Sequence, residues 1–298
     1  MKIKPRTVNA FKDFLLVVPA LVFLLVLTYY PIIDLVRISF TNWNLINDDY
    51  NYVGARNWIW LFKGSGTRYF LSSLRVTALY TAGEIAITLG GGIFLALLFN
   101  KANRSFSVMR ALVFMPRYVA MSSAAVVFLW LLNAEHGILN YFLQIAGIHP
   151  VNWLGQRETA LVSVLMLTGW RAIGYGMMIY LSAIRGISQD YYEAAELDGA
   201  SAFQRFTRIT LPLLSPTTIF LFVTTFISSM KVFQSVDILT GGGPYRSTEV
   251  MVYQIYRYSM ADFRMDRAAT VAIVFFVILL IFTALTMRVS RGSVHYDA

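Results

Sequence analysis

Long apolar stretches alternate with shorter polar ones along the whole chain. A helix that crosses the hydrocarbon core of a bilayer needs about 20 predominantly apolar residues. Six stretches meet that requirement, at residues 14–37, 71–99, 111–133, 159–183, 213–235 and 268–287. The pattern therefore predicts an all-α integral membrane protein with six transmembrane helices.

The composition supports membrane insertion. Hydrophobic residues make up 57% of the 298 residues and charged residues 14%, whereas soluble domains carry about 25% charged residues. The first apolar run ends in Tyr29, Tyr30 and Pro31, and it is longer than the 7 to 15 residues typical of a signal peptide core. We therefore expect it to be retained as the first span.

The distribution of Lys and Arg predicts the orientation. Segments on the N-terminal side of the membrane carry 12 Lys and Arg over 64 residues, and segments on the other side carry 8 over 90. Because basic residues are enriched in cytoplasmic loops, both termini are expected in the cytoplasm. The net charge of +9 is dispersed between apolar runs, so we expect a lipid membrane as the partner and no nucleic acid.

The sequence contains no pattern typical of a catalytic or metal-binding site. The chain has no cysteine, and its three histidines are far apart, so we expect no metal site. A phosphate-binding G-x-x-x-x-G-K-[ST] loop does not occur, and the run Gly241 to Gly243 lacks the lysine that would follow. We expect no catalytic residue and no directly bound cofactor.

A charged segment at residues 184–212 separates the fourth and fifth spans. Ser188 is placed to cap one short helix, and Gly199 can adopt the left-handed conformation that ends it. Ser201 followed by Gln204 fits a capping box for a second helix. The alternative is an amphipathic helix lying on the headgroups, with Phe203 and Phe206 inserted into the lipid and Arg205 and Arg208 on phosphates.

This segment resembles the EAA motif of ATP-binding-cassette importer permeases. That motif has the order E-A-A, D-G-A and I-x-L-P, matched here by Glu193, Ala194, Ala195, Asp198, Gly199, Ala200, Ile209, Leu211 and Pro212. "FMPRYVA" from residue 114, "LTGGGP" from residue 239 and "YQIYRYSM" before the last span resemble the sugar-type branch, which includes maltose and glycerol-3-phosphate permeases. The resemblance covers nearly the whole chain.

The resemblance implies a type I importer permease fold with a cytoplasmic coupling helix that seats in a groove of an ATPase subunit. The coupling residues it implies are Glu193, Ala194, Ala195, Asp198, Gly199, Phe203, Phe206, Leu211 and Pro212. It further implies import of an oligosaccharide or related polyol, with a second permease, two ATPases that bind ATP and Mg, and an extracytoplasmic solute-binding protein as partners. The location would be a bacterial or archaeal cell membrane.

The expected domain organisation follows from these segments. Residues 1–13 and 288–298 form cytoplasmic ends, and residues 14–70 form the first transmembrane helix and an outer loop. Residues 71–287 form the permease core, with the coupling elbow at 185–212.

Ionisable residues inside predicted spans are candidates for the solute pathway, because a charge at that depth is costly. Glu84 and Arg171 lie 13 and 12 residues from the outer ends of their spans, at about 18 to 20 Å along each helix. We hypothesise that they form a buried ion pair or jointly line the pathway. The alternative is that the pair only stabilises the helical bundle.

Further pathway candidates accompany this pair. Trp170 and Tyr175 could stack on sugar rings, and Lys231 and Gln234 lie near the outer end of the fifth span, where Lys231 could instead extend to the headgroups. Arg117 is expected to extend to the cytoplasmic face. The glycines Gly90 to Gly92, Gly169, Gly174 and Gly176 are expected to allow close helix packing or flexibility.

Two alternative functions remain at this level. A secondary transporter could use Glu84 to carry protons or ions, but the EAA elbow would then have no purpose. A permease of the same class could instead carry a solute other than sugar.

Overall fold

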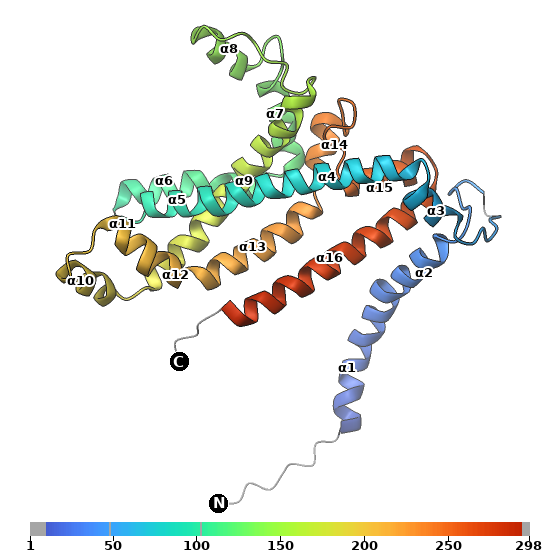
Figure 1. The fold of residues 1–298 in the computed structure, drawn as a ribbon, viewed down its shortest axis with the longest axis horizontal. Coiled ribbons are helices and arrows are strands. Elements are labelled where there is room, and N and C mark those ends of the chain that lie inside the picture. The colour runs from blue at the N-terminus through green and yellow to red at the C-terminus, as the bar shows by residue number, and fades with distance from the viewer. Residues whose placement is uncertain (1–9, 48, 102, 294–298) are drawn as a thin grey trace, which may run out of the picture. The chain divides into compact units, whose positions relative to one another are not determined.

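The computed structural model describes residues 10–47, 49–101 and 103–293, and these residues are predominantly helical (Figure 1). No β-strand occurs within these ranges, apart from an isolated antiparallel bridge between Thr41 and Tyr52. The expected all-α architecture is confirmed for this part of the chain. The predicted cytoplasmic residues 1–9 and 294–298 lie outside it.

The chain divides into two compact units. Among the described residues, the first unit comprises those up to residue 67 and residues 255–274, and the second comprises those in 68–254 and those from residue 275 onward. The last helix, α16 (Met265–Ser293), contributes to both.

The first unit begins with a long apolar helix in three parts. α1 (Ala10–Leu24) continues through a π-helical turn (Leu25–Tyr29) into α2 (Tyr30–Ile38). Pro31 has no N–H to donate to the preceding turn, and the widened turn lies directly before it. The run Leu16–Ile38 has a mean hydropathy of 2.4 and no buried residue in its most apolar window, as suits a helix that faces lipid or another chain.

The remainder of the first unit consists of short helices and turns that make polar and aromatic contacts. It contains α3 (Arg56–Lys63), the end of α15 (Met251–Tyr256) and a π-helical turn (Arg257–Ala261). Asn57 Nδ2 donates hydrogen bonds to the carbonyl oxygens of Ser39 and Thr41, at 3.0 and 2.7 Å. The Arg267 guanidinium lies 4.5 Å from the centre of the Trp60 ring. These contacts fix the residues that follow α2 and those that precede the membrane part of α16.

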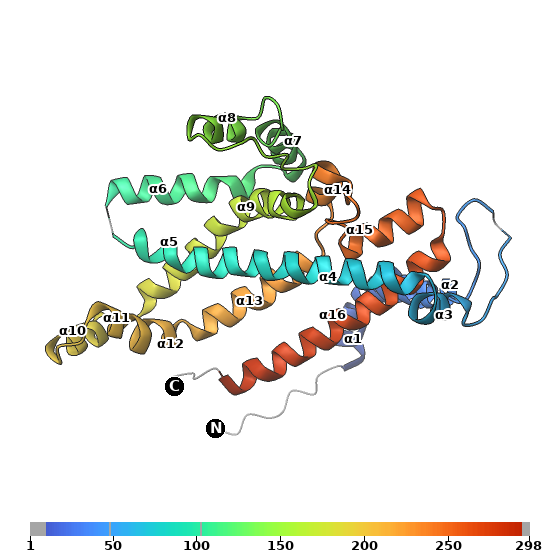
Figure 2. The same ribbon diagram turned by 45° about the horizontal axis from the view of Figure 1, so that its top comes forward.

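The second unit is a helical bundle with α9 (Arg157–Gly186) at its centre (Figure 2). Its first half contains α4 (Gly66–Ile85), a π-helical turn (Ala86–Gly91), α5 (Gly92–Leu98), α6 (Arg104–Phe114), a 3₁₀ turn (Met115–Tyr118), α7 (Met121–Leu131) and α8 (Ile138–Ile145). After α9 come α10 (Gln189–Leu197), α11 (Ala202–Arg205), a π-helical turn (Phe206–Thr210), α12 (Leu211–Leu213), α13 (Ser215–Met230) and α14 (Gln234–Thr240).

Glycines bring α5 and α9 into backbone contact. A Cβ placed on Gly92 would lie 2.8 Å from the carbonyl carbon of Gly176, and one placed on Gly176 would collide with the Thr88 carbonyl oxygen. A Cβ on Gly174 would collide in the same way with the Val113 carbonyl oxygen. The expected close packing is thus confirmed for these glycines, whereas Gly90 faces open space.

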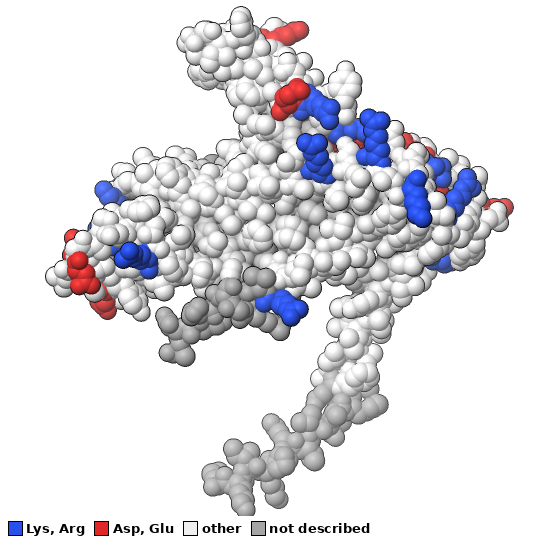
Figure 3. Space-filling model, in the orientation of Figure 1, with Lys and Arg blue, Asp and Glu red and all other residues white. Residues whose placement is uncertain are grey.

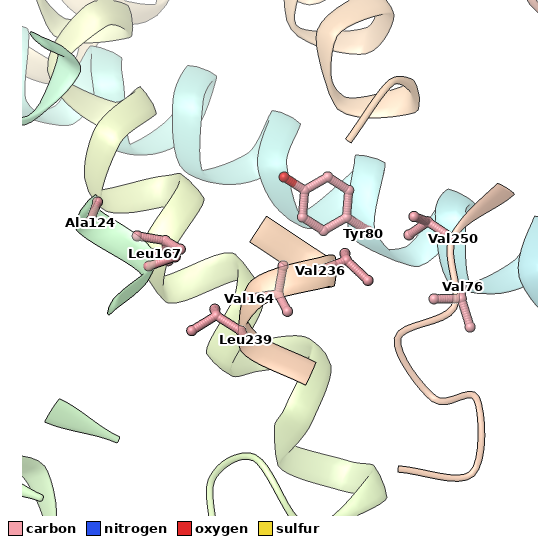
Figure 4. Packing of buried hydrophobic residues seen from close by; sticks show 9 residues of the cluster. Val76, Tyr80, Ala124, Val164, Leu167, Val236, Leu239 and Val250 are labelled. Carbon is pink, nitrogen blue, oxygen red and sulfur yellow. The ribbon is translucent and has the colours of Figure 1, made fainter. Parts of the chain in front are cut away.

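Two apolar clusters hold the second unit together. One joins α4, α7, α9 and α14 through residues that include Tyr80, Val164, Leu167, Val236 and Leu239 (Figure 4). The other lies further along α9 and consists of Ala96, Met177, Tyr180, Leu181, Ile184, Leu214 and Leu221. Because lipid tails are as apolar as these side chains, such clusters stabilise the bundle by close packing and not by exclusion of water.

Four continuous helical runs within the described ranges are long and apolar enough to cross a membrane. They are Leu16–Ile38, Gly66–Leu98, Arg157–Gly186 and Met265–Thr286. Two further candidates are bent pairs, so the described residues supply between four and six spans.

The bent pairs correct two predicted helices. The chain turns by 104° between Tyr118 and Met121, so residues 111–133 do not form one continuous helix. Pro116 interrupts the hydrogen bonding of the last turn, and Val119 and Ala120 are extended. The helical run Ala202–Leu213 meets α13 at an angle of 62°, at the start of the helix predicted at 213–235, and that helix ends at Met230.

Candidate functional site

A polar cavity of about 400 Å³ lies in the second unit, between α4, α9 and the connection from α13 to α14. A smaller cavity of about 150 Å³ adjoins it and shares Glu84 and Arg117 with it. Hydroxyl, charged and aromatic side chains line both. Polar groups at this depth of a membrane bundle are expected to face one another or a water-filled path.

Glu84 is the buried acidic group of the cavity. It belongs to a column on one helix face with Tyr80 and Thr88, since residues four apart lie one turn above each other. Its side chain is 7% exposed, and its Oε2 accepts a hydrogen bond of 2.8 Å from Thr168 Oγ1 on α9. This hydrogen bond joins α9 to α4 and fixes the position of the Glu84 carboxyl group between the two helices.

Arg171 lines the same cavity but does not pair with Glu84. Its Nη2 donates to the Arg117 carbonyl oxygen at 3.3 Å, and its Nη1 lies 3.6 Å from Met121 Sδ. Its Nε is buried without a hydrogen-bond partner. No ion pair joins Arg171 to Glu84 in the described structure. The ion-pair form of our hypothesis is wrong, while the two residues do share one cavity.

Arg117 was missed as a cavity residue. We expected it to extend to the cytoplasmic face, but its guanidinium lies 4.9 Å from the centre of the Tyr175 ring and lines both cavities. The 104° turn that follows Tyr118 redirects the chain and leaves Arg117 beside α9. The only signal of such a turn in the sequence is Pro116, because proline disrupts the hydrogen bonding of a helix.

The other predicted pathway residues divide into two groups. Lys231 and Gln234 line the larger cavity, where Lys231 follows the last residue of α13 and Gln234 begins α14. Tyr175 lines the smaller cavity. Trp170 lines neither: its ring lies 5.6 Å from that of Phe128, and its side chain is 42% exposed.

Small hydroxyl residues of α13 complete the lining. Thr224, Thr225, Ser228 and Ser229 contact one or both cavities. They recur at a spacing of four in an otherwise apolar helix, which places them on one face. That spacing is readable in the sequence and could have identified them.

The elbow between α9 and α13 has the local structure that its sequence predicts. Ser188 Oγ accepts a hydrogen bond from the Asp190 N–H at 3.3 Å, and Ser201 and Gln204 form a reciprocal capping box. Gly199 has φ of +75°. The Ala200 N–H donates to the Ala195 carbonyl oxygen at 2.9 Å, which with the left-handed glycine makes a Schellman motif.

The elbow lies at one end of the second unit (Figures 1 and 2), and several of its apolar and acidic residues are exposed. Figure 3 shows acidic and basic residues at this end, next to a surface without charge. Leu197 is 90% exposed and Phe203 is 74% exposed, while Glu193 is exposed and Phe206 is half-buried. Leu197 was not among the predicted coupling residues, because a single leucine between Glu196 and Asp198 carries no signal in the sequence by itself.

Ala195 is half-buried, and Ala194, Asp198, Leu211 and Pro212 are exposed. Arg205 Nη1 lies 3.0 Å from Glu196 Oε2, which ties α11 to α10. The elbow is therefore a preformed two-helix surface with a fixed turn. Within the described ranges, no group of three or more Asp, Glu or His side chains could hold a metal ion.

Comparisons with known proteins agree with this architecture. Residues 88–290 match the family described as binding-protein-dependent transport system inner membrane component. The chain is 34% identical over 284 residues to a Bacillus subtilis (strain 168) protein named Probable ABC transporter permease protein YurN, covering 94% of this chain and 96% of that protein. It is 31% identical to the Trehalose/maltose transport system permease protein MalF of Thermococcus litoralis, covering 93% of each.

A solved structure has a similar fold. It is a bacterial alginate ABC transporter in complex with an alginate pentasaccharide-bound periplasmic protein, and one of its chains matches with a TM-score of 0.81 and 25% identity. The match covers 95% of this chain and 94% of that one. The chain belongs to the binding-protein-dependent transport system inner membrane component family of ABC importer permeases.

Proposed function

We propose that the chain is one of two permease subunits of an ATP-driven importer that carries an oligosaccharide or related polyol across a bacterial or archaeal cell membrane. The preformed elbow from α10 to α12 is the observation that carries this proposal. It is an exposed, capped, two-helix surface with apolar anchors, which is the form that helix-in-groove docking requires.

The elbow would receive mechanical force from an ATPase subunit in the cytoplasm. Glu193 would make a polar contact to that subunit, and Ala194 and Ala195 would allow close approach of the helix. Phe203 and the newly identified Leu197 would fill apolar pockets, because both are largely exposed. The remaining coupling residues are Asp198, Gly199, Phe206, Leu211 and Pro212.

The connection from the elbow to the cavity is short. α12 leads directly into α13, whose 16 residues span about 24 Å and end beside Lys231. A displacement of the elbow would therefore move a helix that lines the cavity. ATP and Mg would bind the two partner ATPases, and this chain would form the pore without hydrolysing ATP.

The cavity suits a polyhydroxylated solute. Hydroxyl groups of Thr168, Ser228 and Ser229 can exchange hydrogen bonds with sugar hydroxyls, and Tyr175 offers an aromatic face. The names of relatives support this class, since they mention trehalose, maltose, sn-glycerol-3-phosphate and alginate. Glu84, Arg117 and Arg171 would fix the orientation of the solute, with Lys231 and Gln234 at the mouth.

The proposed assembly adds a second, homologous permease, two ATPases and an extracytoplasmic solute-binding protein. The solved alginate transporter was captured with such a periplasmic protein. In this chain, six spans, two of them bent, would place residues 1–13 and 288–298 in the cytoplasm. Residues 14–70 would form the first span and an outer loop, and residues 71–287 the core, with the elbow at 185–212.

The test is reconstitution of the chain with its ATPases, second permease and binding protein. Glu193→Lys should reduce the amount of ATPase that copurifies and abolish solute-stimulated ATP hydrolysis. Glu135→Lys makes the same charge change at an exposed position in the loop before α8, and it should leave both unchanged. Equal retention of the ATPase by the two variants would refute the role of the elbow.

The same preparation tests the solute class. Neutral oligosaccharides and polyols should stimulate ATP hydrolysis, while amino acids and inorganic ions should not. If only an amino acid stimulated ATP hydrolysis, the proposal of an ATP-driven importer would stand, but the proposal of a carbohydrate solute would be refuted. Uptake that follows a proton gradient without any ATPase would overturn both.

A further inference from the structure

A second large groove of the second unit takes no part in the proposed pathway. Its volume is about 520 Å³, and it lies between the first turns of α4, the first turns of α9 and the loop before α15. Basic side chains gather in this region of the surface in Figure 3. The arginines that line the groove are Arg68, Arg75, Arg157 and Arg246.

Most of this positive charge is uncompensated. Arg246 pairs with buried Glu249 at 3.4 Å and lies 3.9 Å over the Tyr69 ring. Arg68, Arg75 and Arg157 are exposed and form no ion pair with any side chain that the structure describes. Glu158 is the one acidic residue in the lining, so three free arginines face a single carboxylate.

The walls of the groove are apolar. Leu71, Val76, Leu79, Leu161 and Val162 contribute to its lining, and Leu71 and Leu79 are more than half exposed. A ligand that fits both features is amphipathic, with a negative head and an apolar tail. A soluble acidic protein would satisfy the arginines but would leave the apolar walls without a matching surface.

The depth expected for the groove from the length of its helix fits such a ligand. The continuous helical run Gly66–Leu98 has 33 residues and is therefore about 50 Å long, against a hydrocarbon core of about 30 Å. If the run is centred, roughly 10 Å projects at each end, so the core boundary falls close to Ser72. Arg68 then lies at headgroup level, Arg75 reaches back toward it, and Leu79 lies among acyl chains.

We propose that this groove binds an anionic phospholipid of the leaflet that surrounds the start of α4. The guanidinium groups of Arg68, Arg75 and Arg157 hold the phosphate, a pairing that their planar donors favour. One acyl chain lies along Leu71 and Leu79. Basic residues are usually enriched in cytoplasmic loops, whereas the start of α4 is expected on the opposite side of the membrane. A lipid site explains why arginines occur there.

The experiment measures lipid binding to the full-length chain in its delipidated complex by native mass spectrometry. Phosphatidylglycerol and phosphatidylcholine with identical acyl chains are titrated separately, and inorganic phosphate serves as a soluble competitor. Wild type should retain phosphatidylglycerol in preference to phosphatidylcholine. Inorganic phosphate at the same concentration should not displace it.

The main variant combines Arg68→Gln, Arg75→Gln and Arg157→Gln. Each basic residue near an anionic membrane surface contributes about fivefold in affinity, so the triple variant should bind phosphatidylglycerol roughly one hundredfold more weakly. Ser72→Trp keeps every arginine and fills the groove that Ser72 lines, and it should also weaken binding. The control removes three exposed charges elsewhere, with Lys101→Gln, Arg104→Gln and Arg288→Gln, and should retain the bound lipid.

Three results would overturn the proposal. Equal binding of the two lipids would show that the arginines do not select a negative head. Loss of lipid in the control to the same extent would show diffuse attraction and no site. Unchanged lipid binding in the triple variant, together with weaker capture of the solute-binding protein, would assign the groove to an acidic protein surface.

Discussion

The backbone contact between α5 and α9 makes Gly92 intolerant of even one methyl group. An alanine Cβ at this position would lie 2.8 Å from the Gly176 carbonyl carbon, 3.0 Å from the Gly176 Cα and 3.1 Å from the Met177 nitrogen. Favourable contacts between carbon atoms lie at about 3.5 to 4.0 Å. All three neighbours are backbone atoms, so no side chain can rotate away and the helices must separate by roughly 0.5 to 1 Å.

The cost can be estimated from two opposing effects. Overpacking of a tight core costs about 1 to 3 kcal/mol, while replacing a helical glycine with alanine returns about 0.5 to 1 kcal/mol. Gly90 provides the matched control, because it lies two residues away and a Cβ there meets nothing within 4 Å. Both glycines are helical, Gly90 in the π-helical turn and Gly92 in α5, so the two variants gain a similar propensity and their difference of about 1 to 3 kcal/mol reports mainly the clash.

The measurement is unfolding of the purified chain by titration from mild detergent into dodecyl sulfate, followed by circular dichroism. Gly92→Ala should unfold at a lower fraction of dodecyl sulfate than wild type, and Gly90→Ala at the same or a higher fraction. If the two variants unfold together, the helices are not held at backbone contact and the packing described for this seam is incorrect.

Three further predictions concern the elbow, an outer loop and the cavity. Gly199→Val places a β-branched residue at φ of +75° and should cost about 1 to 2 kcal/mol locally; hydrogen exchange at the end of α10 should accelerate, and unchanged exchange would contradict the strain. Asn140→Ala removes hydrogen bonds to Ala134, Val151 and Trp153 and should speed proteolysis of residues 134–154, since each buried group left unpaired costs about 1 to 3 kcal/mol. Thr168→Val removes the 2.8 Å hydrogen bond to Glu84 and should lower stability by about 1 to 3 kcal/mol; the dodecyl sulfate titration measures it, and an unshifted midpoint would show that Glu84 is held by other groups.

Features that depend on neighbouring residues could be predicted from the sequence. The elbow forms as expected because Ser188, Gly199 and the pair Ser201 and Gln204 act on backbone groups within a few residues of themselves. The close packing of Gly92 on α5 against Gly176 on α9 could also be predicted, because only residues without a side chain permit backbone contact between helices.

The side of a helix on which a single charged or aromatic residue lies could not be predicted. Counting residues from the end of a span gives the height of a side chain but not the side of the helix on which it lies. Trp170 and Arg171 are adjacent and therefore point about 100° apart, so only Arg171 reaches the cavity. Arg117 was misplaced because its position depends on a 104° turn that no periodic pattern encodes.

The cavity takes several of its charged residues from places where helices are interrupted. Arg117 lies just before the extended residues Val119 and Ala120, and Lys231 lies in the gap between α13 and α14. The contacts of Gly92 and Gly176 leave no room between α5 and α9, whereas residues at helix ends are the positions that absorb changes in backbone torsion in other proteins. We therefore expect a change in the shape of the cavity to occur at these two helix interruptions, while α5 and α9 keep their packing.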